Sequence, residues 1–211
     1  MSTARASLVE AMQAEELSAD GRLARGQRAR RKVAEALLEL LHEGGPEPTA
    51  KIVAKRAGVS LRLVFHHFSD IDDLYRAAAL LQLERYWSAL PMLSATLPRP
   101  TRIDRTVRYR SVLYEEISPV RRAAVRRSGT SAEITEGLAF TNVLLRDNTL
   151  AAFGPELNVL PKKQRDDRLA ALDSATSWEV WERLRQNSGL TVAAAKRVMA
   201  FTLHALLDVD V

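Results

Sequence analysis

The chain lacks cysteine, has few aromatic residues and contains no long apolar run. None of its 211 residues is cysteine, which excludes disulfide bonds and thiolate chemistry. Aromatic residues make up only 6% of the chain, and the abundance of alanine, leucine and arginine favours helices over strands. No stretch approaches about eighteen consecutive apolar residues, the length that a membrane-spanning helix needs. Because the N-terminus also lacks the pattern of a signal peptide, we expect a cytoplasmic protein without a membrane partner.

The residues that could perform chemistry form no catalytic or metal-binding pattern. The four histidines, His42, His66, His67 and His204, are not spaced with one another or with acidic residues as metal ligands are. Neither a glycine-rich phosphate loop nor a nucleophile elbow is present. We therefore predict no enzyme activity, no cofactor and no metal site.

Positive charge is concentrated in one part of the chain. The formal net charge is +5, and residues 21–66 contain ten Lys or Arg against four Glu. The ten basic residues are Arg22, Arg25, Arg28, Arg30, Arg31, Lys32, Lys51, Lys55, Arg56 and Arg62. Contacts to nucleic-acid phosphates need such a concentration, although a solvated tail over residues 21–31 is an equally good interpretation of its first part. A second basic zone, residues 99–127, is interpreted as a solvated helix face.

The stretch from Thr49 to Phe68 has the length, the helix-capping residues and the turn glycine of a helix-turn-helix. Thr49 can cap a first helix with its hydroxyl, and Gly58 stands where the left-handed backbone of a helix end is needed. Ser60 can cap a second helix, whose inner face holds Val64 and Phe68, four residues apart. In a helix-turn-helix the second helix enters the major groove of DNA.

This stretch resembles the TetR family of bacterial transcriptional regulators. The family pattern is Thr-x-x-x-(Ile/Val)-Ala-x-x-Ala-Gly-Val-Ser, followed by a recognition helix that ends in aromatic-x-His-Phe. The matching residues are Thr49, Val53, Ala54, Ala57, Gly58, Val59, Ser60, Phe65, His67 and Phe68. The positions that face DNA by this resemblance are Thr49, Lys51, Leu61, Arg62, Leu63, Phe65, His66 and His67. Arg62 is the candidate for reading guanine O6 and N7, with a phosphate contact as the alternative.

Three positions depart from the family pattern. Phe65 replaces the usual Tyr, Arg62 and Leu63 replace a common Gly-Thr pair, and Ile71 stands where a Lys commonly contacts phosphate. The basic stretch from Arg22 to Arg31, which begins within a predicted flexible arm at residues 1–27, is a hypothetical compensation. These departures leave room for an alternative function, a helical protein-interaction module or ligand sensor that has lost DNA binding.

Apolar periodicity, glycine and proline predict an all-α chain throughout. Apart from the helix-turn-helix, the predicted helices span residues 28–42, 69–90, 101–117, 119–127, 130–153, 161–187 and 191–207. With the arm at residues 1–27, they give a three-helix DNA-binding domain at residues 28–74 and a helical regulatory and dimerisation domain at residues 75–211.

The resemblance implies a homodimer whose C-terminal domain binds a small molecule. The predicted interface of two C-terminal helices is Leu172, Thr176, Val180, Leu184, Ala195, Met199, Thr202 and Leu206. The predicted lining of the effector pocket is Trp87, Tyr109, Tyr114, Phe140, Trp178 and Trp181. The alternative for both sets is that they only fill the core of one chain. The predicted function is a repressor that an unknown small-molecule effector releases from a palindromic, double-stranded DNA operator.

Overall fold

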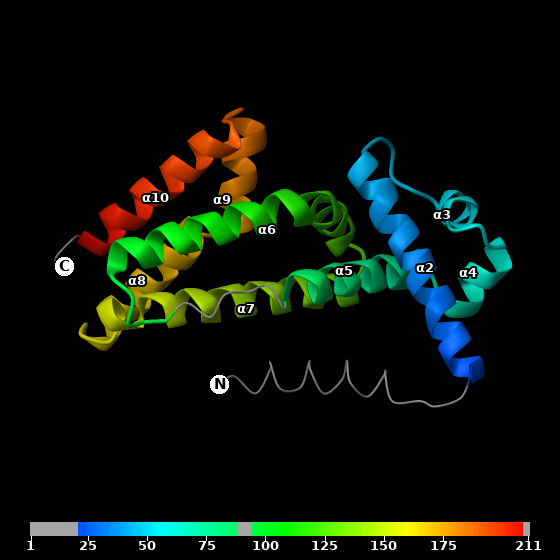
Figure 1. The fold of residues 1–211 in the computed structure, drawn as a ribbon, viewed down its shortest axis with the longest axis horizontal. Coiled ribbons are helices and arrows are strands. Elements are labelled where there is room, and N and C mark those ends of the chain that lie inside the picture. The colour runs from blue at the N-terminus through cyan, green and yellow to red at the C-terminus, as the bar shows by residue number, and fades with distance from the viewer. Residues whose placement is uncertain (1–20, 88–93, 209–211) are drawn as a thin grey trace. The chain divides into compact units, whose positions relative to one another are not determined.

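The computed structural model describes residues 21–87 and 94–208, and all regular elements within these ranges are helices (Figure 1). The chain divides into two compact units, Met1–Leu81 and Gln82–Val211. The predicted all-α fold with an N-terminal helix-turn-helix domain and a C-terminal helical domain is confirmed. The division falls within α5 (Ile71–Trp87), a few residues beyond the predicted domain boundary after Leu74.

The first helix, α2 (Gly21–Glu43), begins well before the predicted start at Arg28. Residues 21–27 of the predicted flexible arm are therefore helical, and residues 1–20 of that arm lie outside the described residues. Gly26, in this early part of the helix, lies near α4, since a Cβ built on it would lie 3.8 Å from the His67 ring. The predicted core face of the helix is confirmed. Its buried residues include Val33, Ala34, Leu37, Leu38 and Leu41.

The next two helices, α3 (Ala50–Ala57) and α4 (Leu61–His67), begin and end as predicted. The Thr49 hydroxyl accepts from the N–H of the third residue after it at 3.4 Å, and the Ser60 hydroxyl does the same at 3.1 Å. Gly58 ends α3 with φ +64°, in the left-handed region. Val53, Ala54 and Ala57 of α3 are buried, whereas Ile52 is 45% exposed.

Substituting Gly58 with alanine is expected to lower the free energy of unfolding by about 1–2 kcal/mol, because a Cβ is strained at positive φ. Space is not the cause, since the nearest atom to an added Cβ is the flexible Lys32 Nζ at 3.9 Å. The control is Gly137→Ala within helix α7, where φ is ordinary and nothing lies within 4 Å; it should stabilise by about 0.5–1 kcal/mol. Urea unfolding followed by circular dichroism measures both. Equal stability of Gly58→Ala and the parent would contradict the prediction.

The predicted capping of α5 is confirmed. Asp70 accepts the N–H of Asp73 at 2.8 Å, and the Asp73 carboxylate in turn accepts the N–H of Ser69 at 3.2 Å. Within the first unit, Leu74, Ala77, Ala78 and Leu81 are buried as predicted. The predicted end of this helix near Leu90 lies outside the described residues.

The helix α6 (Arg99–Ser128) corrects the predicted break at Ser118 and Pro119, because it continues through both residues. Pro119 removes one helical hydrogen bond, but neighbouring groups support the preceding turn. The Ser118 hydroxyl donates to the Tyr114 carbonyl at 2.5 Å, and Gln82 Nε2 donates to the Glu116 carbonyl at 3.1 Å. Tertiary contacts therefore override the local signal.

The helix α7 (Ala132–Leu157) extends past the end predicted at Phe153, which appears instead as a kink. Phe153 has φ −115° and ψ 16°, and a further turn containing Pro155 follows it. This turn is held by Arg102 of α6, whose guanidinium donates to the Ala152 carbonyl at 2.6 Å and to Glu156 at 2.7 Å. The predicted N-cap is confirmed at Ser131, one of the two candidates.

The single helix predicted over residues 161–187 is wrong. The structure has α8 (Lys162–Ala175), α9 (Trp178–Glu182) and a π-helical turn, η1 (Arg183–Asn187). The break occurs at Thr176 because the Tyr114 hydroxyl donates to its carbonyl at 2.6 Å, while Ser177 caps α9. The last helix, α10 (Val192–Asp208), begins after the predicted cap Thr191.

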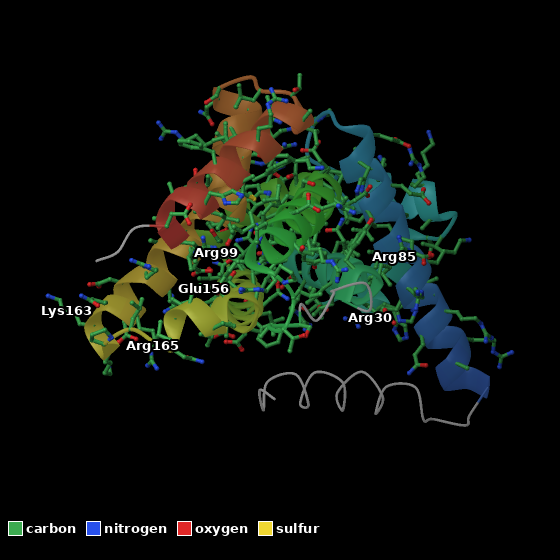
Figure 2. The ribbon with its side chains drawn as sticks, turned by 60° about the vertical axis from the view of Figure 1, so that its left-hand side comes forward. Arg30, Arg85, Arg99, Glu156, Lys163 and Arg165 are labelled. Atoms are coloured by element: carbon green, nitrogen blue, oxygen red, sulfur yellow. The ribbon has the colours of Figure 1, made fainter. Side chains whose placement is uncertain are left out.

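The second unit has one core, built from α6–α10. Figure 1 shows α6 and α7 side by side and running in opposite directions, as their contacts require. Figure 2 shows Arg99, at the start of α6, near Glu156, at the end of α7. The apolar core beside these helices includes the fully buried Trp181.

Candidate nucleic-acid interface

The outer face of α4 consists of side chains that do not pack into the first unit. Leu61 is 40% exposed and Phe65 is 51% exposed, and Arg62 and His66 are also exposed. Val64 between them is buried, so the helix has one packed face and one solvent face. Such a short helix with an apolar inner side and a mixed outer side can present groups to a DNA groove.

The beginning of α3 adds a second group of exposed residues. Thr49 and Lys51 are both exposed. The Thr49 hydroxyl oxygen accepts the capping bond, so its proton stays available for a phosphate oxygen. Lys51, Lys55 and Arg62 form no ion pair with any residue that the structure describes. Their charges are therefore available to an anion.

Other basic residues that the sequence suggests for phosphate contacts are engaged within the unit. Arg56 donates from both terminal nitrogens to Glu43 at 2.7 Å, which ties α3 to the end of α2. The hydrogen bond from Arg56 lowers the pKa of Glu43. Arg30, labelled in Figure 2, lies 5.0 Å from the centroid of Phe68 and 3.4 Å from Asp73. The sequence gives the charge of these residues but not their partners, because the partners lie on other helices.

His67 lies against α2, although the sequence favours a backbone contact or packing against the following helix. Its ring lies 3.8 Å from a Cβ built on Gly26. Burial lowers the pKa of His67, and the neighbouring His66 and Arg30 lower it further. The imidazole is therefore neutral at neutral pH and can offer a phosphate an N–H donor but no charge. The half-buried Leu63 and this ring flank the exposed face of α4.

The predicted effector-binding residues differ in how deeply they are buried. Tyr114 and Trp178 are buried and bonded within the core, the latter through Nε1 to the Ser118 hydroxyl at 2.9 Å. Trp181 is fully buried. Tyr109 and Phe140 are half-buried, and the side chain of Trp87 lies outside the described residues.

Half of the predicted dimer interface is buried in the core of a single chain. The four buried residues are Leu172, Thr176, Ala195 and Met199, none more than 1% exposed. A partner copy could not reach them without unfolding the unit. The four half-buried residues are Val180, Leu184, Thr202 and Leu206.

Phe201, the most exposed large apolar residue of α10 at 73%, is absent from the interface predicted from the sequence. Together with Ala194, Val198 and Ala205 it recurs at intervals of four, three and four residues, so the four share one helix face. Val198 is 40% exposed. The same spacing in the sequence could have identified this stripe, but a neighbouring stripe has the same period and is the buried one.

No group of three or more His, Asp or Glu side chains in the described ranges could hold a metal ion. Among the helices of those ranges, none combines the length and the apolar character needed to cross a membrane.

Comparisons with known proteins agree with this geometry. The model of the family described as "Bacterial regulatory proteins, tetR family" matches residues 34–78, which include α3 and α4. The crystal structure of a transcriptional regulator from Rhodococcus sp. Rha1 is similar with a TM-score of 0.64 and 18% identity, over 84% of this chain and 95% of that one. At that identity the likeness concerns the fold. None of the curated proteins matches the chain. Residues 34–78 therefore resemble the tetR family of bacterial regulatory proteins, and the likeness to the solved regulator extends over the all-helical fold.

Proposed function

We propose that this protein is a homodimeric repressor that binds a palindromic DNA operator and leaves it when a small molecule binds its second unit. The observation that supports DNA binding most directly is the solvent face of α4. Arg62 lies on that face without an ion pair among the described residues, while the caps at both helix starts hold α3 and α4 rigidly. Two copies of such a helix would read two half-sites of one operator. We propose no enzymatic activity.

The helix α5 offers a route from an effector to the DNA-binding unit. Its C-terminal part belongs to the second unit, where Tyr86 donates to a carboxylate oxygen of Glu116 at 2.9 Å. Gln82 donates to the carbonyl of the same residue at 3.1 Å. A displacement of α6 would therefore act on α5, whose earlier turns pack in the first unit. An effector can shift α6 and α5 in this way only if it binds the displaced arrangement of these helices more tightly than the arrangement that binds DNA.

Fluorescence anisotropy with the duplex upstream of the protein's own gene tests DNA binding. A scrambled duplex of equal length, measured over a range of salt concentrations, is the control. Tight binding to the native duplex alone is expected. Equal, salt-sensitive binding to both would mean DNA binding with an operator elsewhere. Absence of binding to either duplex at low salt would favour a helical protein-interaction module that has lost DNA binding.

Replacing Arg62 with alanine is expected to weaken operator binding by about 1–3 kcal/mol, or roughly 5- to 150-fold, if the guanidinium reads a guanine. The variant should then lose specificity mainly at one base position, so that substituting that base pair in the operator should weaken its binding only a little. Uniform weakening on all sequences, with a salt slope smaller by about 1, would identify a phosphate contact instead. Arg126→Ala, an exposed arginine on α6, is the charge-matched control and should bind as the parent does. Unchanged affinity of Arg62→Ala would contradict both roles.

A further inference from the structure

A buried positive charge lies between α6 and α7, apart from the proposed DNA interface. Arg110 of α6 is 0% exposed. Its Nη2 donates to the Leu145 carbonyl at 2.6 Å and to the Thr149 hydroxyl at 3.1 Å. Its Nε and Nη1 have no hydrogen-bond partner in the described part of the chain. Because arginine keeps its charge in proteins, a positive charge and several N–H donors are buried without an ion-pair partner among the described residues.

Two hydroxyl groups on the same face of α6 are also buried and have no hydrogen-bond partner within residues 21–87 and 94–208. They belong to Thr106 and Tyr109, four residues and one residue before Arg110. The guanidinium carbon lies 6.0 Å from the centroid of the Tyr109 ring. Burial raises the pKa of Tyr109 far above its ordinary value, so its hydroxyl keeps a proton to donate. Thr106, Tyr109 and Arg110 together are called the Arg110 cluster.

The Arg110 cluster lacks acceptors for its donors. Guanidinium N–H groups can only donate, so each needs an acceptor oxygen, and a negatively charged acceptor would also compensate the charge of the guanidinium. No carboxylate of the described residues forms an ion pair with Arg110. Asp173, whose carboxylate interacts with Arg110 at longer range, is paired with Arg146 at 3.6 Å. Buried groups of this kind are satisfied in most proteins by protein, water or ligand.

We propose that the Arg110 cluster binds the carboxylate of a small organic acid with an apolar body, and that such an acid is the effector. The second half of this inference rests on the proposed function, and the first does not. A carboxylate is acceptor-only and negatively charged, so it matches the unpaired donors in both respects. The surrounding core residues Val107, Tyr114 and Leu145 are apolar or aromatic, which favours an aryl or alkyl body over a second charged group.

Thermal unfolding of the full chain tests binding without any DNA. The probes are benzoate, phenylacetate and octanoate at constant pH and ionic strength, each beside its neutral amide. At least one acid is expected to raise Tm by about 3–6 °C at roughly ten times its Kd, and its amide should not. The proposal is overturned if no acid raises Tm, or if each amide raises it as much as its acid.

Substitutions locate the binding site. Arg110→Met puts a shorter, unbranched apolar side chain in place of the guanidinium and removes the charge, so it should fold with an unchanged or higher Tm and lose the response to the acid. Arg108→Met, at an exposed position on the same helix, should keep the response. If Arg110→Met does not fold, the pair Thr106→Val with Tyr109→Phe removes two donors at nearly constant shape and should weaken acid binding about tenfold. A full response in either variant of the cluster would refute the assignment.

Anisotropy with operator DNA separates this inference from the proposed function. An acid that raises Tm and also releases DNA supports both. An acid that raises Tm without releasing DNA supports the carboxylate site and overturns its role as an effector site. Tight DNA binding by a protein that responds to none of the acids overturns the carboxylate site and leaves the DNA-binding proposal intact.

Discussion

Trp181→Ala is expected to lower the free energy of unfolding by about 3–5 kcal/mol, because it removes a large side chain from the core of the second unit. Trp181 is 0% exposed, and its ring centroid lies 6.4 Å from that of Tyr114. Its Nε1 donates to Glu115 at 2.9 Å, and the same carboxylate accepts Arg185 Nε at 2.8 Å. Alanine would leave a cavity where α6 meets α9 and would remove one of the donors to this carboxylate.

Two other variants show which part of this loss comes from packing. Trp181→Phe retains one buried aromatic ring but removes the N–H donor together with the second ring of the indole, so it should cost about 1–3 kcal/mol. Val112→Ala, at a residue of α6 that is 58% exposed, should change stability by less than about 0.5 kcal/mol. Urea unfolding at one fixed protein concentration is the measurement, because dimerisation would make stability depend on concentration. A loss for Trp181→Ala no larger than that for Val112→Ala would show that this residue is not a core residue.

The helix-turn-helix is the part of the fold that the sequence predicts most completely. Its boundaries depend on short-range chemistry: a hydroxyl bonded three residues ahead at Thr49 and Ser60, and positive φ at Gly58. These signals act within one helical turn, so the residue types alone locate them. The same holds for Ser131, Thr191 and the start of α5.

The helix boundaries that were predicted wrongly in the second unit have a different origin, because they depend on contacts between residues far apart in the sequence. A proline at position 119 ends a helix by local rules, yet α6 continues through it with hydrogen bonds from Ser118 and Gln82. Thr176 shows the reverse. Local rules would continue the helix through this residue, but the helix is broken where the Tyr114 hydroxyl donates to the Thr176 carbonyl. Neither partner can be identified from a one-dimensional pattern.

In the candidate DNA site, too, some features depend on local sequence and others on contacts between distant residues. The exposure of Leu61, Arg62 and Phe65 follows from helical period once Val64 is placed inside. The sequence does not show which basic side chains are available to bind phosphate. Arg56 of α3, for example, is hydrogen-bonded to Glu43 at the end of α2. Charge counts along the sequence therefore overstate the number of phosphate contacts that the first unit can make.

Phe201→Glu is expected to weaken the proposed dimer by at least about 2 kcal/mol, because a large apolar side chain at an interface centre is replaced by a charge. Phe201 is 73% exposed on α10, and Val198, 40% exposed, lies on the same face. Exposure of this size on adjacent turns suggests a surface that another molecule covers. Sedimentation velocity at several concentrations would show a shift to monomer. Operator affinity should fall with it, since one recognition helix contacts only one half-site.

Two further substitutions distinguish an interface from a core and from any other apolar surface. Met199→Glu, at a residue of α10 that is 1% exposed, should unfold the second unit rather than dissociate a folded dimer. Val143→Glu, at a 50% exposed residue of α7, should leave both stability and oligomeric state unchanged. Dissociation by Val143→Glu but not by Phe201→Glu would move the interface to α7. If Met199→Glu gave folded monomers, the core assignment of the inner face of α10 would be wrong, and the interface first predicted from the sequence would be restored.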